Sequence, residues 1–87
     1  MENKIIEMAS FIKSSKNREK IVISLVESKI KIPSEIAKDT GLPLNYISML
    51  LKELKERDIV KCLNENSKKG RFYKLTKEGY NAFKFIK

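Results

Sequence analysis

A run of three cations in the last third of the chain has the residue types and spacing to bind an anion. Lys68, Lys69 and Arg71 lie in the segment NENSKKGR, whose composition is typical of a turn. The whole chain carries 19 basic and 11 acidic side chains, a formal net charge of +8, and residues 61–87 hold 8 basic and 2 acidic of these. A basic surface of this kind favours nucleic acid as a partner first and an anionic membrane second.

A second group of side chains can supply contacts other than charge. Asn45, Met49 and Lys52 recur at separations of four and three residues, the spacing that places side chains on one face of a helix. Asparagine can form two hydrogen bonds with adenine, methionine can pack against the methyl group of thymine, and lysine can bind guanine or phosphate. These chemistries fit the base edges in the major groove of a DNA duplex. The alternative is an ordinary solvated helix face.

The apolar residues of the chain exclude a membrane protein. No apolar run approaches the roughly 20 residues that a membrane-spanning helix needs. Near the start of the chain, Glu2 and Glu7 interrupt what would have to be the apolar stretch of a signal peptide. We therefore expect a soluble, cytoplasmic protein that has no membrane partner.

The supply of reactive side chains also limits the function. The chain has no histidine and one cysteine, Cys62, so it lacks the usual zinc-binding arrangements and cannot form an internal disulfide. We expect no metal and no cofactor, although a site made of carboxylates alone stays open. Acid-base catalysis would depend on carboxylates or lysines, and none of them has a recognisable catalytic arrangement, so we do not expect an enzyme. Cys62 is expected to be a half-buried, small apolar residue.

Residues 33–57 have the spacing of a helix-turn-helix. Pro33 fits the first turn of a helix, and Gly41 fits its end because glycine readily adopts the left-handed backbone conformation. Ala37 offers the small side chain that two closely crossing helices require. The second helix is expected from residue 44 or 45 to residue 57, with a buried side formed by Ile47, Leu50, Leu51 and Leu54. The alternative is a simple bend between two packed helices.

Two further helices are expected before this segment. Apolar residues recur at helical spacing through residues 1–14 and predict an N-terminal helix. A second helix follows, for which Asn17 is the predicted cap. The segment KIKI at residues 29–32 is too short to be more than an edge strand or a linker.

A β-hairpin and a last helix are expected after it. The segments IVKCL at residues 59–63 and RFYKL at residues 71–75 are rich in β-branched and aromatic residues, so residues 59–75 predict a two-stranded hairpin. Thr76 can cap a helix over residues 76–87, which Gly79 weakens. The apolar side of this helix is predicted to hold Tyr80, Phe83 and Ile86.

In this order the elements give a mainly α fold with a small β-hairpin, in a single domain over residues 1–87. The sequence resembles the small winged-helix transcriptional regulators of archaea, which are related to the ArsR and MarR groups. The resemblance implies a winged helix-turn-helix DNA-binding domain with additional N-terminal and C-terminal helices. The resemblance lies in SSKNREKI, in IPSEIAKDTGLPLNYISMLLKELKERDIV and in KKGRFYKLTKEG, and it spans residues 14–80. Asp58 stands where the family commonly has glycine, and aspartate tolerates the left-handed conformation better than most residues.

The resemblance implies sequence-specific binding of double-stranded DNA by a homodimer, with the second helix of the helix-turn-helix in the major groove and the basic hairpin, or wing, on the backbone or minor groove. In addition to the helix face and the wing, Tyr46 and Ser48 are placed to bond phosphates, and Ser34 lies at an exposed helix start. The candidate DNA-binding residues are Ser34, Asn45, Tyr46, Ser48, Met49, Lys52, Lys68, Lys69 and Arg71. The alternatives are that Ser34 only caps its helix and that the wing lysines only keep the hairpin soluble.

The outer helices and two glutamates lead to further expectations. The apolar residues 5–12 and those of the last helix exceed what a three-helix core and wing can cover, so we predict a homodimer through the N-terminal and C-terminal helices; the alternative is packing within one chain. Glu53 and Glu56 are expected at the margin of the DNA surface, paired with Lys52 or Lys55.

The alternative function is a winged-helix module for protein interactions in a transcription or replication assembly. The sequence leaves open the operator, the regulated gene, any effector, the direction of regulation and the geometry of the dimer.

Overall fold

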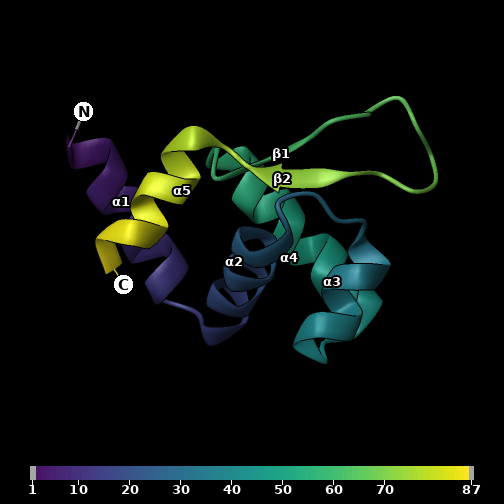
Figure 1. The fold of residues 1–87 in the computed structure, drawn as a ribbon. Coiled ribbons are helices and arrows are strands. Elements are labelled where there is room, and N and C mark those ends of the chain that lie inside the picture. The colour runs from purple at the N-terminus through teal and green to yellow at the C-terminus, as the bar shows by residue number, and fades with distance from the viewer. Residues whose placement is uncertain (1, 87) are drawn as a thin grey trace.

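The computed structural model describes residues 2–86, which form five helices and a two-stranded antiparallel hairpin (Figure 1). The elements in chain order are α1 (Glu2–Lys13), α2 (Lys16–Ser28), α3 (Pro33–Thr40), α4 (Leu44–Glu56), β1 (Val60–Cys62), β2 (Tyr73–Leu75) and α5 (Lys77–Ile86). The loop between β1 and β2 extends away from the helices, as Figure 1 shows. The predicted mainly helical fold with one small hairpin is confirmed.

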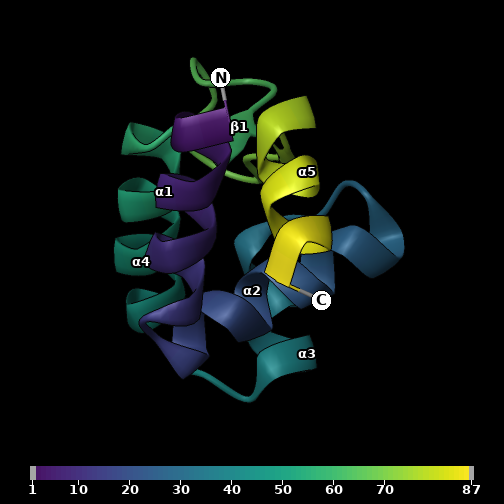
Figure 2. The same ribbon diagram turned by 90° about the vertical axis from the view of Figure 1, so that its left-hand side faces the viewer.

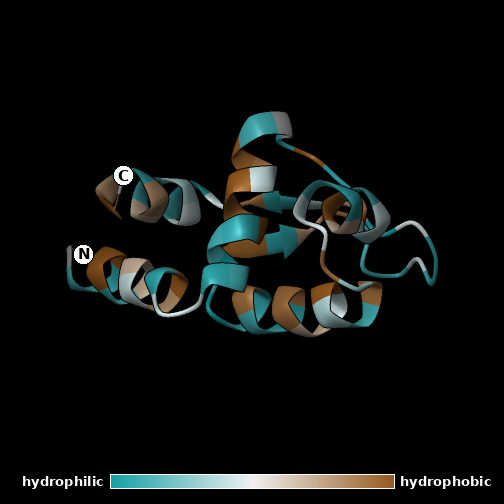
Figure 3. Ribbon diagram, turned by 90° about the horizontal axis from the view of Figure 1, so that it is seen from below, coloured by the Kyte–Doolittle hydropathy of each residue, from teal (hydrophilic) through white to brown (hydrophobic). Residues whose placement is uncertain are grey.

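One hydrophobic core joins all of these elements. Its buried residues are Met8, Ala9, Ile12, Ile21, Val22, Leu25, Ile36, Ile47, Leu50, Leu51, Leu54, Ile59, Val60, Leu75 and Ala82. The four residues predicted for the buried side of α4 are all among them. In Figure 3 the helices carry both hydrophobic and hydrophilic residues, as expected for helices with one buried side. Burial of α4 on one side leaves its other side exposed.

The turn between α3 and α4 forms as the sequence predicts. Pro33 occupies the first turn of α3, and Gly41 ends the helix with a φ of 75°, in the left-handed region. The amide of Gly41 donates a hydrogen bond of 2.8 Å to the carbonyl oxygen of Ala37. Asp58, after α4, also adopts the left-handed conformation, with a φ of 60°, so the departure from glycine is accommodated.

The cap of α2 differs from the prediction. Ser15, and not Asn17, caps this helix, because the Ser15 hydroxyl accepts a hydrogen bond of 3.3 Å from the amide of Arg18. Ser15 and Asn17 are both good cap residues, and the sequence alone did not place the helix start. The segment before α3 contributes one β-bridge, between Lys31 and Tyr73 of β2, so it lies at the edge of the hairpin.

The C-terminal helix α5 begins as predicted, with the amide of Gly79 donating to the Thr76 hydroxyl at 2.9 Å. Its buried side differs from the prediction. Tyr80 is 46% exposed, and Gly79 and Ala82 are buried in its place. A Cβ atom on Gly79 would lie 2.2 Å from the carbonyl oxygen of Ile59, so this glycine permits a close approach of α5 to the backbone before β1.

The two outer helices α1 and α5 lie side by side (Figure 2). Ile5 of α1 and both Phe83 and Ile86 of α5 pack against the core, so much of the apolar surface of these helices is covered within the chain. Ile6 and Phe85 remain exposed, Phe85 to 62%. The alternative of packing within one chain therefore accounts for most of this apolar surface but leaves Ile6, Tyr80 and Phe85 partly uncovered.

Candidate nucleic-acid interface

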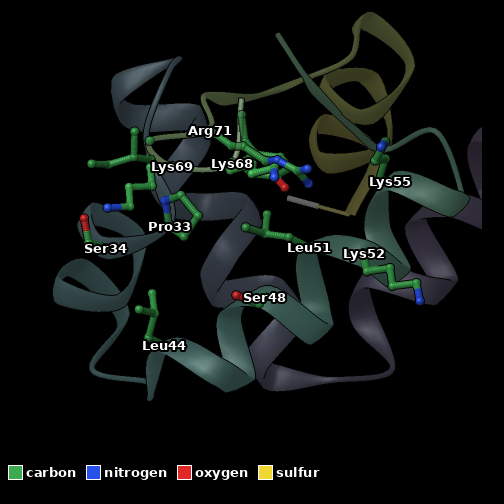
Figure 4. Close-up of a pocket in the computed structure, with 13 residues that line it drawn as sticks. Pro33, Ser34, Leu44, Ser48, Leu51, Lys52, Lys55, Lys68, Lys69 and Arg71 are labelled. Carbon is green, nitrogen blue, oxygen red and sulfur yellow. The ribbon is translucent and has the colours of Figure 1, made fainter. Parts of the chain in front are cut away.

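A groove of about 550 Å³ separates α4 from the wing, which comprises β1, β2 and the loop between them (Figure 4). Its lining comes from the start of α3, from α4, and from the wing loop and β2. The lining residues are Ile32, Pro33, Ser34, Leu44, Ser48, Leu51, Lys52, Lys55, Lys68, Lys69, Gly70, Arg71 and Tyr73. Five cationic side chains thus border one concave surface, which is suited to a polyanion.

Six of the nine predicted DNA-binding residues line this groove. They are Ser34, Ser48, Lys52, Lys68, Lys69 and Arg71. Figure 4 shows Lys68, Lys69 and Arg71 of the wing together with Ser48 and Lys52 of α4 around the same space. The helix-turn-helix and the wing therefore present their polar groups to one surface, although they lie about twenty residues apart in the chain.

The other three predicted residues lie outside the groove lining but on exposed parts of α4. Asn45, Tyr46 and Met49 are all exposed, and Met49 is 48% accessible to solvent. The intervening Ile47 is fully buried, because it anchors α4 in the core. The exposed side of α4 thus continues beyond the groove and offers amide, phenol and thioether groups.

Hydrogen bonds within the wing order its loop. The side chain of Asn64 accepts from the amide of Phe72 at 2.8 Å and donates to the carbonyl oxygen of Gly70 at 3.2 Å, so it joins the two arms. Arg71 donates through Nε to the carbonyl oxygen of Ser67 at 2.8 Å. This bond fixes the orientation of the guanidinium group, which reduces the entropy lost when the group binds a ligand.

Lys55 is a groove residue that the sequence reasoning did not include. Its Nζ lies 2.5 Å from Oε1 of Glu65 in the wing, and this hydrogen bond raises the pKa of Lys55 and lowers the pKa of Glu65. The prediction that Glu53 pairs with Lys52 or Lys55 is wrong, because Glu53 forms its ion pair with Arg18 of α2. Lys55 follows Lys52 by three residues, and that helical spacing was the available signal.

A buried lysine joins the helix-turn-helix to the wing. Lys31 is 8% exposed, and its Nζ donates to the Ser24 hydroxyl at 2.9 Å and to the carboxylate of Asp39. The backbone of Lys31 pairs with Tyr73 through two hydrogen bonds of 2.8 and 3.0 Å. Hydrogen bonds from Lys31 and then Ser24 lower the pKa of Asp39. No sequence pattern pointed to this cluster.

Two further observations concern metal sites and membrane-spanning helices. Among residues 2–86, no group of three or more cysteine, aspartate or glutamate residues is placed to hold a metal ion. None of the helices in this part of the chain combines the length and apolar character needed to cross a membrane. Cys62 is half-buried, as expected, with its thiol 3.7 Å from the side-chain oxygen of Asn64.

This architecture defines the class of fold: a MarR-like winged helix. A mutant MarR from E. coli complexed with operator DNA matches with a TM-score of 0.75 and 24% identity, covering 95% of this chain and 60% of that chain. A MarR-family transcription regulator matches with a TM-score of 0.77 and 16% identity, covering 94% and 55%. NadR in complex with 4-hydroxyphenylacetate matches with a TM-score of 0.76 and 19% identity, covering 98% and 63%.

These similarities are structural. No family model and no curated protein matches the sequence. The chain spans between 55% and 63% of the length of the three solved proteins. The similar structures are those of transcription regulators, and the parts of those proteins that this chain does not cover have no counterpart in the comparison.

Proposed function

We propose that this chain is a transcription regulator of the MarR-like type that binds specific sequences of double-stranded DNA as a homodimer and has no catalytic role. The observation that carries the proposal is the shared groove, because Lys52 and Lys55 of α4 and the three cations of the wing border one surface beside an exposed helix face. Residues 1–87 act as a single DNA-binding domain. A protein with this fold has been solved with operator DNA, which supports DNA as the partner here.

In this proposal, α4 enters the major groove of the duplex. Asn45, Met49 and Lys52 face base edges, where they distinguish adenine, thymine and guanine by hydrogen bonds and apolar contact. Tyr46 and Ser48 bond the flanking phosphates. Residues that read bases need exposure and a rigid support, and the buried side of α4 supplies that support.

The wing and the start of α3 bind the DNA backbone. Lys68, Lys69 and Arg71 contact phosphates or enter the minor groove beside α4. Ser34, exposed at the first turn of α3, bonds a phosphate with its hydroxyl and nearby backbone amides. These contacts fix the position of α4 on the duplex without reading its sequence.

The homodimer forms through α1 and α5. Ile6 and Phe85 border a groove of about 750 Å³ that also includes Lys4, Lys77 and Glu78. An exposed apolar surface with both signs of charge at its edge can meet a second copy of itself about a two-fold axis. Two copies would place their α4 helices in successive major grooves, about 10 base pairs apart.

Selection of bound duplexes from a random pool tests the proposal. A regulator should enrich one pseudo-palindromic sequence and bind it about a thousandfold more tightly than random duplex. Sedimentation of the protein with the enriched duplex should give two chains per site. Weak binding without enrichment would contradict the proposal and favour the alternative of a protein-interaction module with an acidic partner.

A further inference from the structure

One ion pair crosses from α4 to the wing at the edge of the DNA-binding groove. Lys55 of α4 lines the groove, and Glu65 lies in the first part of the wing loop. The Lys55 Nζ and Glu65 Oε1 atoms are 2.5 Å apart, within hydrogen-bonding distance. Lys55 is thus the one groove cation among residues 2–86 whose ammonium group forms an ion pair with a carboxylate.

The pair is accessible to a competing anion. The side chain of Lys55 is 38% exposed and that of Glu65 is 59% exposed. Solvent screens an ion pair of this exposure, so it contributes little to folding and can exchange its partner. The neighbouring Lys52 and the wing cations attract a polyanion to the same groove, which brings phosphate groups close to Lys55.

A phosphate at this place meets two opposing charges. The ammonium group of Lys55 attracts the phosphate, whereas the carboxylate of Glu65 repels it and occupies a donor of the same ammonium group. The raised pKa of Lys55 and the lowered pKa of Glu65 both arise first from their mutual hydrogen bond, so each group is charged at neutral pH. The carboxylate therefore offsets one of the five positive charges that border the groove.

We propose that Glu65 competes with DNA phosphate for Lys55, and that this competition weakens the sequence-independent binding of the groove to duplex DNA. The inference rests on the proposed function, because it concerns the same groove. It assigns Lys55 as a residue that can bind phosphate and Glu65 as the residue that reduces this binding by forming an ion pair with Lys55. The number of phosphates that the groove neutralises, and with it the salt dependence of binding, then depends on a carboxylate of the wing.

The test measures binding to a random-sequence duplex of about 30 base pairs, three helical turns, over a range of salt concentrations. The proteins are the wild type, Glu65→Gln, Lys55→Gln and the double variant. Glu65→Gln should bind about three- to fivefold more tightly and steepen the log-log salt slope by up to about 0.9 per protomer. Lys55→Gln alone should weaken binding only by about as much as the loss of one net positive charge, because its ammonium group is bound to Glu65 and not to phosphate.

A matched control separates this local competition from a change in net charge. Glu7→Gln removes the same charge from an exposed position of α1, which lies at the opposite end of the molecule from the wing loop in Figure 1. Glu65→Gln should exceed this control when Lys55 is present and equal it in the Lys55→Gln background. Thermal unfolding of all variants should have nearly the wild-type midpoint, because Glu7 and Glu65 are exposed and solvent screens the half-buried Lys55 in its ion pair.

Four results would overturn the inference. Equal effects of Glu65→Gln and Glu7→Gln would show that only net charge matters, and an unchanged effect without Lys55 would show that the pair plays no part. Weaker binding by Glu65→Gln would mean that the carboxylate supports the shape of the wing. If the wild-type protein bound no duplex even at low salt, the proposed function would fail first, and the inference with it.

Discussion

Arg18 of α2 and Glu53 of α4 form an ion pair in which both Nε and Nη2 of the arginine lie 3.2 Å from Oε1 of the glutamate. The same guanidinium group lies 3.8 Å above the ring of Phe11 and donates to the carbonyl oxygen of that residue at 3.1 Å. Glu53 therefore connects α4 to the junction of α1 and α2. Glu53, which the sequence places at the margin of the DNA surface, thus helps to hold α4, the helix proposed to enter the major groove, in place.

The Arg18–Glu53 pair should contribute measurably to stability. Because only 19% of the arginine side chain is exposed, Arg18→Ala loses a charged hydrogen bond and packing on Phe11, and we expect a loss of about 1 to 3 kcal/mol. Urea unfolding of Arg18→Ala, Glu53→Ala and the double variant would give a coupling of about 0.5 to 2 kcal/mol. Strictly additive effects would show that the pair itself stabilises nothing.

Substitutions on the exposed face of α4 should change sequence preference. Asn45→Ala and Lys52→Ala are each expected to cost about 1 to 3 kcal/mol on the selected site and to relax the preference at one base position. Ser10→Ala, at an exposed position of α1, serves as a control with no expected effect. Binding titrations with the selected duplex and single-base variants provide the measurement. Unchanged affinity and preference for Asn45→Ala would rule out the assigned role of this face.

Truncation of the wing cations should act on all sequences alike. The double variant Lys68→Ala/Lys69→Ala is expected to weaken the selected and random duplexes by the same factor, because contacts with phosphate carry no sequence information. The log-log salt slope should decrease in magnitude by about 0.9 for each phosphate that the variant no longer neutralises. Anisotropy titrations at several salt concentrations measure both quantities. A weakening confined to the selected site would instead indicate that the wing reads bases.

The Asp39 carboxyl group should make stability depend on pH in acid. Its pKa is lowered by the hydrogen bonds from Lys31 and Ser24, so ionised Asp39 stabilises the fold above its unfolded pKa of about 4. This contribution is lost as the pH falls through the lower pKa of the folded state. Asp39→Asn should therefore be less stable than the wild type at neutral pH and should lose less stability on acidification. Urea unfolding between neutral pH and about pH 2 measures the difference, and parallel pH profiles would contradict it.

Gly79 should resist substitution although it lies within a helix. Alanine favours a helix by about 1 kcal/mol over glycine, but its Cβ here would lie 2.2 Å from the carbonyl oxygen of Ile59. We expect Gly79→Ala to destabilise the protein by about 1 to 3 kcal/mol, because backbone must move to relieve the contact. Asn81→Ala, at an exposed position of the same helix, is the control for helix propensity. Stabilisation by Gly79→Ala would show that α5 shifts at little cost.

The features that the sequence predicted correctly depend on local patterns. The left-handed Gly41, the start of α3 at Pro33 and the cap of α5 by Thr76 each require only a few neighbouring residues. The buried side of α4 follows from helical spacing alone. Six of the nine predicted site residues line one groove because a helix-turn-helix followed by a hairpin brings these segments together, and their role in DNA binding stays a prediction.

The features that the sequence did not predict depend on contacts between distant segments. Glu53 has two lysines close to it in the sequence, Lys52 and Lys55, yet its partner lies 35 positions earlier in the chain, at Arg18. From the sequence alone, Gly79 is expected only to weaken its helix. In the fold, the lack of a side chain at Gly79 makes room for the backbone of Ile59. The exposure of Tyr80 has the same origin, since Gly79 and Ala82 form the side of α5 that faces the rest of the chain, and Tyr80 lies outside that side.

Lys31 holds the wing through its backbone and α3 through its ammonium group. This residue thus ties the wing to the helix-turn-helix, and the Lys55–Glu65 pair links α4 to the wing as well. We expect these links to hold the wing and the helix-turn-helix at one spacing, so that the affinity for a duplex depends on the width of its grooves as well as on its bases.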